Sequence, residues 1–318
     1  MTASRAPALT RPADFERFWA RTRAELDEVP AAVRREPGGE RRGKLELEEL
    51  SFASLEGMRV RGYLIRSPDD RPRPLVVHSH GYGGEAARMW SWAERGLDVA
   101  GIDIRGHGAS IEGSGPLSVH GYALTGAESP DTYVLRGAVC DYMRAVEVAR
   151  AELRGASSRT VLTGTSFAGG LATMAEAQLQ VADLLVLAVP SLGWTEGRRA
   201  LAGAGSGAEI EAYLTGHPDR ERAVMAALGY FDTMNFAGLL RCPTLVGLGL
   251  RDNVVPPETV QAIVGHLRAP HELVELPVSH TESPEERRWE LFEEEWLRLA
   301  SSGVPPGFGS TPPVPRHL

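Results

Sequence analysis

The chain has 318 residues, of which 42% are hydrophobic and 24% are charged, and its formal net charge at pH 7 is −8. This composition is typical of a globular protein with a sizeable core, and the acidic balance argues against broad nucleic-acid binding, which needs a basic face. With only two cysteines, Cys140 and Cys242, the sequence excludes a disulfide-stapled scaffold.

The lengths of the apolar runs bear on the cellular location of the protein. Residues 1–11 contain no apolar run of signal-peptide length, and no stretch approaches the roughly 20 apolar residues that cross a bilayer. We therefore expect a soluble protein of the cytoplasm that binds neither membrane nor nucleic acid.

Helical spacing appears first along the chain. Residues 14–29 place Phe15, Phe18, Trp19 and Leu26 on one face and predict a helix. Residues 34–44, which follow, are charged and contain glycine, so we expect a connector there.

Short apolar segments then alternate with helical ones. Helical patterns such as 134–154 and 169–180 lie between them, and the apolar runs suit strands that are buried on both faces. This alternation predicts an α/β fold, with a mostly parallel eight-stranded sheet flanked by helices and its first two strands antiparallel. The expected strands are 45–52, 59–66, 74–80, 98–105, 160–164, 184–190, 244–250 and 271–277.

Two regions interrupt the alternation. Residues 111–133 are rich in Gly, Ser and Pro and predict a long loop. Residues 191–240 separate two strands by more than one crossover helix and contain helical stretches at 208–214 and 220–227. We expect this helical insertion to form a lid or cap over a site.

These boundaries define the expected domain organisation. Residues 1–300 are interpreted as a single α/β domain that contains the insertion. Residues 301–318 are rich in proline and glycine and are expected to form an irregular tail.

A serine follows the strand expected at 160–164, and a helical pattern starts directly behind it. The sequence from Gly164 to Ala168 approximates the nucleophile elbow G-x-S-x-G, with Ser166 at its centre. The elbow needs small residues on both sides of the serine, and Ala168 adds one methyl group where glycine is usual. The alternative is a serine that caps an ordinary helix, and this segment alone does not decide between the two.

A base and an acid follow in the order that such folds use. Asp252 and His280 each lie just beyond a later strand, and functional side chains collect at the carboxyl ends of strands in open α/β sheets. Taken singly, Asp252 could cap the helix expected near Pro256, and His280 could be an ordinary loop histidine. Taken together and in this order, they predict a catalytic triad with Ser166.

An oxyanion hole needs two backbone donors. One is expected from Phe167, which follows the nucleophile, and the other from Tyr82 in the glycine-rich loop after the strand at 74–80. The alternative is a metal pair formed by His78 and His80, which is disfavoured because no third ligand is evident. We therefore expect neither a metal nor a cofactor, and His80 is expected to brace the loop.

Further segments are similar to a known family. They are RPADFERFW (11–19), HGYGG (80–84), DIRGHG (103–108), PDTY (130–133), YFDTMNF (230–236) and CPTLVGLG (242–249). With these segments in one order, the chain resembles the acetyl xylan esterase and cephalosporin C deacetylase family, the seventh family of carbohydrate esterases. The resemblance implies an α/β hydrolase that removes acetyl groups from small substrates such as xylo-oligosaccharides or cephalosporins. It also implies a cytoplasmic homo-oligomer, with a ring-like hexamer as one such assembly.

Carried over by position, the resemblance makes Ser166 the nucleophile, Asp252 the acid and His280 the base. It also makes Tyr82 and Phe167 the oxyanion donors. The chain departs from the family beside these residues. His107 stands where the family has glutamine, and Phe167 and Ala168 stand where it has Gln-Gly. The family's G-H-E sequence at the base becomes SHTE (279–282).

Aromatic residues near the expected site are candidates for substrate contact. We expect Tyr82, Trp90 and Trp194 to bind substrate, with packing in a helical core as the alternative for the two tryptophans. Because the residues beside the nucleophile differ from the family's, two other functions stay open. One is a hydrolase or acyltransferase for larger acyl esters of a specialised metabolite, and the other is a non-catalytic binding protein.

Overall fold

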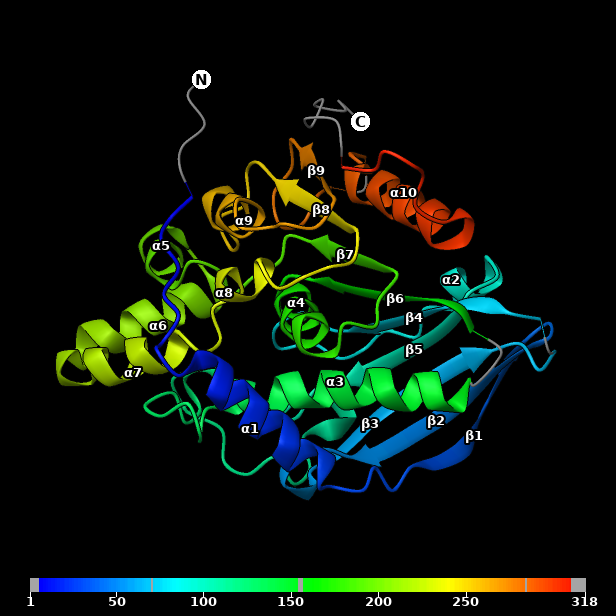
Figure 1. The fold of residues 1–318 in the computed structure, drawn as a ribbon, viewed down its shortest axis with the longest axis horizontal. Coiled ribbons are helices and arrows are strands. Elements are labelled where there is room, and N and C mark those ends of the chain that lie inside the picture. Colours follow the sequence, from blue (N-terminus) through cyan, green and yellow to red (C-terminus); the bar gives the residue numbers. More distant parts are fainter. Residues whose placement is uncertain (1–5, 70, 154–156, 284, 310–318) are drawn as a thin grey trace.

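A computed structural model of the chain describes residues 6–69, 71–153, 157–283 and 285–309 (Figure 1). Its strands form the centre of the molecule, with helices on both sides. Figure 1 shows α1 and α3 on one side of the strands and α2 and α10 on the other. This arrangement confirms the predicted α/β fold with a large, mostly parallel sheet.

Nine strands of the described chain form one sheet in the order β1-β2-β3-β5-β4-β6-β7-β8-β9, so the predicted count of eight is wrong by one strand. The pairs β1–β2, β2–β3 and β3–β5 are antiparallel, and the pairs from β5–β4 to β8–β9 are parallel. The strands are β1 (Arg34–Arg42), β2 (Leu45–Ala53), β3 (Arg59–Arg66), β4 (Arg73–Ser79), β5 (Asp98–Asp103), β6 (Ser157–Thr165), β7 (Leu184–Ala188), β8 (Thr244–Gly249) and β9 (His271–Leu276).

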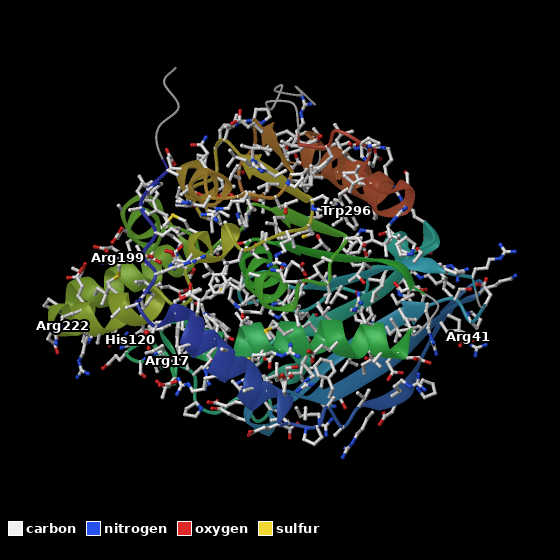
Figure 2. The ribbon with its side chains drawn as sticks, in the orientation of Figure 1. Arg17, Arg41, His120, Arg199, Arg222 and Trp296 are labelled. Atoms are coloured by element: carbon white, nitrogen blue, oxygen red, sulfur yellow. The ribbon has the colours of Figure 1, made fainter. Side chains whose placement is uncertain are left out.

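The prediction of a connector at 34–44 is wrong, because these residues include strand β1 at the edge of the sheet. Almost every side chain of β1 is exposed, so the strand shows no alternation of buried and exposed residues that a sequence pattern could reveal. It forms because its backbone pairs with β2, with an irregularity between Pro37 and Arg41. Figure 2 shows Arg41 at the outer edge of the molecule.

The α-helices cover the sheet and form the insertion. Helix α4 starts at Phe167, two residues before the predicted helix, so that Ser166 immediately precedes it. The helices are α1 (Phe15–Asp27), α2 (Trp90–Glu94), α3 (Val134–Glu152), α4 (Phe167–Leu179), α5 (Thr195–Leu201), α6 (Gly205–Gly216), α7 (Glu221–Leu228), α8 (Met234–Ala237), α9 (Pro257–Val264) and α10 (Arg288–Ser302).

The sheet separates two hydrophobic layers. Leu162 of β6 points into the layer that α1, α3 and α4 cover, and its neighbour Val161 points into the layer that α2 and α10 cover. Successive residues of a strand alternate between its faces, so an uninterrupted apolar run fills both layers. This packing explains why the central strands have continuous apolar sequences.

The predicted insertion lies between β7 and β8 and contains α5 to α8. Its ends are held together by Asp232, a buried residue. The Asp232 carboxylate accepts hydrogen bonds from the backbone N–H groups of Trp194 (2.9 Å) and Thr195 (2.8 Å) and from the Thr195 hydroxyl (2.9 Å). Helix α1 packs on the insertion, because Trp19 Nε1 donates to the carbonyl of Tyr230 at 3.0 Å.

The predicted loop at 111–133 contains only a short 3₁₀ turn, Tyr122–Leu124, and otherwise lacks regular structure within the described chain. Part of the predicted tail, residues 310–318, lies outside the described residues. The division into one domain and a tail stays a prediction. No helix in the described part of the chain combines the length and the apolar character that crossing a membrane requires.

Candidate active site

Ser166 lies in a tight turn between β6 and α4. Its backbone has φ +56° and ψ −115°, a conformation that residues with side chains rarely adopt. The turn is held because Ser166 N–H donates to the carbonyl of Ala188 at 2.8 Å, and the Ser166 carbonyl accepts from Ser191 N–H at 3.0 Å. The serine expected at an elbow therefore has the strained backbone that an elbow requires.

The turn explains the small residues beside Ser166. A Cβ atom at Gly164 would lie 2.3 Å from the carbonyl carbon of Ala168, so Gly164 cannot be replaced without moving the backbone. Ala168 is fully buried and is accommodated with its methyl group. The departure from G-x-S-x-G therefore leaves the turn intact.

Asp252 and His280 form a hydrogen-bonded pair. His280 Nδ1 lies 2.8 Å from Asp252 Oδ2, and Asp252 Oδ1 accepts from the N–H groups of Val254 (2.8 Å) and Val255 (2.9 Å). The Asp252 side chain is fully buried, whereas that of His280 is 24% exposed. A carboxylate can only accept here, so Nδ1 carries the proton and Nε2 remains available as a base.

Ser166, Asp252 and His280 follow β6, β8 and β9, so all three lie at the carboxyl edge of the parallel strands. Within the described residues, hydrogen bonds join His280 to Asp252 but do not join Ser166 to His280. Catalytic hydrogen bonds often form only when substrate binds, so the lack of this bond does not remove Ser166 from the arrangement.

The two expected oxyanion donors belong to neighbouring segments. Phe167 is the first residue of α4, and Tyr82 lies in the loop after β4. Their rings make a T-shaped contact with centroids 5.7 Å apart. The structure therefore brings the glycine-rich loop and the elbow together.

The Tyr82 hydroxyl connects the glycine-rich loop to the rest of the site. It donates to Glu209 Oε2 on α6 at 2.6 Å and accepts from the backbone N–H of Ala123 at 2.9 Å. Burial, followed by the bond to Glu209, raises the pKa of Tyr82 well above its usual value. The phenol is therefore neutral and links the loop to the insertion.

Two of the residues that depart from the resembled family, His107 and Phe167, lie close to each other. His107 is buried and its ring lies 4.4 Å from that of Tyr122, 4.7 Å from that of His80 and 5.9 Å from that of Phe167, measured between centroids. Burial lowers the pKa of His107 to about 4, so its imidazole is neutral near pH 7. His107 and Phe167 together form an aromatic wall behind the glycine-rich loop.

His78 and His80 make contacts with different parts of the structure. The His78 ring lies against Trp92 and bonds to the Tyr63 hydroxyl at 2.7 Å, whereas His80 Nε2 accepts from Ile104 N–H at 3.1 Å. Among the described residues, no group of three or more His, Cys, Asp or Glu side chains is placed to hold a metal ion. The geometry gives the disfavoured His-x-His metal pair no support.

The two other aromatic residues expected to touch substrate are packed in apolar layers. Trp90 is buried, with the Arg42 guanidinium 4.9 Å from the centroid of its ring. Trp194 packs against α8 and α9, beside Met234 and Ile263. Substrate contact by these two tryptophans stays a prediction that their packing does not favour.

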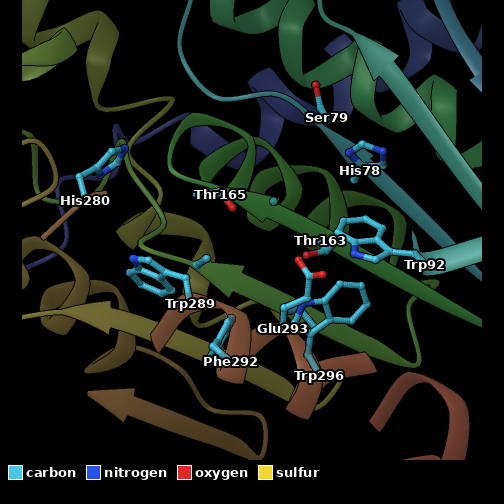
Figure 3. A pocket seen from close by; sticks show the side chains of 13 residues that line it. His78, Ser79, Trp92, Thr163, Thr165, His280, Trp289, Phe292, Glu293 and Trp296 are labelled. Atoms are coloured by element: carbon cyan, nitrogen blue, oxygen red, sulfur yellow. The ribbon is translucent and has the colours of Figure 1, made fainter. Parts of the chain in front are cut away.

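A cavity of about 200 Å³ opens beside His280, between the sheet and α10 (Figure 3). We call it the lateral cavity, and its walls include the aromatic residues Trp92, Trp289, Phe292 and Trp296. Glu293 also lines it. No residue of α10 was expected at the site. The signal that could have revealed them is the spacing i, i+3, i+4 and i+7 of Trp289, Phe292, Glu293 and Trp296, which places these four on one helical face.

Curated relatives cover parts of the chain. An acetyl esterase, Axe7A of Xylanibacter ruminicola, is 21% identical over 292 residues, which are 86% of this chain and 64% of that protein. A monoacylglycerol lipase of Mycolicibacterium smegmatis is 44% identical over 66 residues, which are 20% of this chain and 23% of that protein. The chain thus spans less than two thirds of the length of either relative.

Solved structures share the whole fold. An acetyl xylan esterase from Paenibacillus sp. R4 superposes with a TM-score of 0.85 at 24% identity, covering 93% of this chain and 96% of that chain. Acetyl xylan esterase 1 from Thermoanaerobacterium sp. JW/SL YS485 gives 0.84 at 21% identity, covering 94% and 96%. The family model described as acetyl xylan esterase (AXE1) matches residues 4–290. Because this match extends over most of the sequence, the chain belongs to the acetyl xylan esterase family.

Proposed function

We propose that this protein is a serine carboxylesterase that removes acetyl groups from small acetylated substrates, such as xylo-oligosaccharides or cephalosporin-type compounds. The observation that carries the proposal is the 2.8 Å bond between His280 Nδ1 and Asp252 Oδ2, at the sheet edge where the elbow holds Ser166. Membership of the acetyl xylan esterase family supports the acetyl group as the part removed.

In the proposed reaction, His280 Nε2 takes the proton of Ser166 Oγ while this oxygen attacks the ester carbonyl carbon. The N–H groups of Tyr82 and Phe167 donate to the oxyanion of the tetrahedral intermediate. The ester C–O bond then breaks, and His280 returns the proton to the leaving alcohol. Water, deprotonated by His280, attacks the acetyl-serine, releasing acetate and restoring the Ser166 hydroxyl. The chain supplies the nucleophile, proton carrier and oxyanion donors, so these steps need no cofactor.

The test of this mechanism is Ser166→Ala with p-nitrophenyl acetate as substrate. We expect kcat to fall by a factor on the order of 10⁴ to 10⁶, as when a triad nucleophile is removed. Ser191→Ala is the matched control, because Ser191 is also buried beside the elbow but has no role in the proposed chemistry. Full activity of Ser166→Ala, with the control also active, would contradict the proposal.

A second candidate is a hydrolase or acyltransferase that acts on larger acyl esters of a specialised metabolite. The aromatic wall of His107 and Phe167 favours it, because the resembled family has amide side chains at both positions. The local similarity to a protein named monoacylglycerol lipase points in the same direction. Rates for p-nitrophenyl esters of increasing acyl length separate the two candidates: an optimum at acetate supports deacetylation.

A third candidate is a non-catalytic binding protein with a hydrolase fold. A fluorophosphonate probe distinguishes it, since the probe labels an activated serine covalently. Labelling that disappears in Ser166→Ala supports an enzyme, whereas absence of labelling in the native protein supports the binding protein.

We further propose that the protein works in the cytoplasm as a homo-oligomer, with a hexamer as the assembly that the family resemblance implies. The measurement is the mass in solution by light scattering. A monomer mass at working concentration would contradict oligomerisation.

A further inference from the structure

We propose that the lateral cavity binds an organic ammonium group on the alcohol part of the ester. The inference rests on the proposed esterase function and adds a substrate class to it. His280 lines the cavity, and a general acid must reach the leaving oxygen within hydrogen-bond distance. As part of the proposal, we place the alcohol part of the ester on the side of His280 where the cavity opens.

The charge inside the cavity points to a cation. Glu293 contributes the carboxylate, and no Lys or Arg is among the described residues that line the cavity. In the described part of the chain, no hydrogen bond or ion pair engages Glu293. His78 does not neutralise it, because burial lowers the pKa of His78 to about 4 and keeps its imidazole uncharged at neutral pH. A half-buried carboxylate without a partner is stabilised when a positive group enters.

The walls indicate which kind of cation fits. Trp92 and Trp296 make a T-shaped pair with centroids 4.8 Å apart, and Trp289 and Phe292 make another at 5.9 Å. Aromatic rings attract ammonium groups through their faces. A metal ion instead needs several oxygen ligands, and this cavity supplies one carboxylate. The lining therefore favours an alkylated ammonium over an inorganic ion.

The position of Glu293 on α10 strengthens the argument. It lies on the face of α10 that Trp289, Phe292 and Trp296 turn toward the sheet, where an apolar side chain would pack without cost. Figure 3 shows its carboxylate directed from α10 toward the strand that carries Thr163. The volume of the cavity, about 200 Å³, is several times the roughly 30 Å³ that one water occupies, so the cavity has room for more than a single water. Packing alone gives no reason for a carboxylate at this position, whereas binding of a cation does.

Two acetate esters of the same shape test the charge preference. Acetylcholine carries a trimethylammonium group where 3,3-dimethylbutyl acetate carries an uncharged tert-butyl group. We expect the native protein to hydrolyse acetylcholine with a kcat/KM at least about tenfold higher, as a desolvated ammonium contact supplies. Glu293→Gln preserves the shape of the side chain and should bring the ratio of the two kcat/KM values close to one.

The matched control is Glu294→Gln, which removes a carboxylate from the exposed side of the same helix. It should leave the ratio at the native value. Equal kcat/KM values for the two esters in the native protein would overturn the proposal. A ratio in Glu293→Gln that equals the native ratio would do so as well.

Binding of tetramethylammonium separates this inference from the proposed function. The cavity contains Trp92, Trp289 and Trp296, so intrinsic fluorescence reports occupancy. If p-nitrophenyl acetate is not hydrolysed, the esterase function fails, and the fluorescence titration then decides the cation site alone. Saturable binding that weakens at least about tenfold in Glu293→Gln supports the site. No saturable change in the native protein overturns it.

Discussion

His80 Nδ1 donates a hydrogen bond of 2.8 Å to the carbonyl oxygen of Gly81. The direction is fixed, because Ile104 N–H donates to Nε2 of the same ring and leaves the proton on Nδ1. The Gly81 carbonyl belongs to the same planar peptide group as the N–H of Tyr82. The same carbonyl also accepts from Gly84 N–H at 3.0 Å, so His80 and Gly84 together fix the direction of the Tyr82 N–H.

We therefore predict that His80→Leu lowers kcat for p-nitrophenyl acetate by about 10- to 100-fold with little change in KM, since a misdirected oxyanion donor affects mainly the transition state. His80→Asn places an amide N–H near the former Nδ1 and should recover most of the loss. The measurement is kcat and KM for both variants. An equal loss in the two, or a parallel rise in KM, would show that His80 has only a structural role.

Asp252→Asn should lower kcat by a factor on the order of 10⁴, because an amide favours the wrong imidazole tautomer. The asparagine Oδ1 can still accept from the N–H groups of Val254 and Val255, so the turn should remain folded. Rates with p-nitrophenyl acetate and the thermal unfolding midpoint are measured together. A stable variant with near-native kcat would exclude His280 as the base that Asp252 orients.

Gly164→Ala should lower the free energy of unfolding by about 1–3 kcal/mol, because its Cβ would lie 2.3 Å from the carbonyl carbon of Ala168 and force the elbow apart. Gly216→Ala is the matched control, since outside its chain neighbours and its own helix backbone no described atom lies within 4 Å of the added Cβ. Urea unfolding of both variants provides the comparison. Equal stability would mean that the elbow relaxes freely.

Asp98→Asn should change how stability depends on pH. Burial, opposed by Arg73, raises the pKa of Asp98 from 3.8 to about 6, and among the described residues its Oδ1 has no hydrogen-bond partner. Between pH 3.8 and about pH 6, Asp98 holds a proton in the folded state that it has lost in the unfolded state. The contribution of Asp98 to the free energy of unfolding therefore falls as pH rises.

The asparagine does not titrate. The stability of Asp98→Asn relative to the native protein should therefore increase from about pH 4 to about pH 6 and then level off. Urea unfolding at a series of pH values measures this difference. A difference that stays constant across the range would indicate that Asp98 titrates alike in both states.

Sequence patterns predicted the strand ends that carry Asp252 and His280, because buried parallel strands leave continuous apolar runs that are easy to place. Strand β1 left no such run. Its pairing with β2 uses backbone groups, and its exposed side chains follow no burial period. The pairing that stabilises β1 is with residues of β2, outside the sequence of β1 itself.

Helix α10 is absent from the predicted elements, although Trp289, Phe292 and Trp296 have helical spacing. The lateral cavity was harder to foresee. It requires Trp92 from α2, Thr163 from β6 and Glu293 from α10 to meet, and no local pattern states which distant elements pack together. Chain order was enough to predict that Ser166, Asp252 and His280 each follow a strand, whereas it does not state that α2, β6 and α10 meet at a cavity.

Within the described part of the chain, the outer edge of strand β1 is unpaired. Six of its nine residues are charged: Arg34, Arg35, Glu36, Glu40, Arg41 and Arg42. If a strand from another molecule paired with this edge, the charged side chains of β1 would be held against the side chains of the incoming strand, which is unfavourable. The edge therefore protects the sheet from open-ended growth into fibres. If copies of this protein associate, we expect them to meet through helices and loops, so that the assembly closes at a defined size.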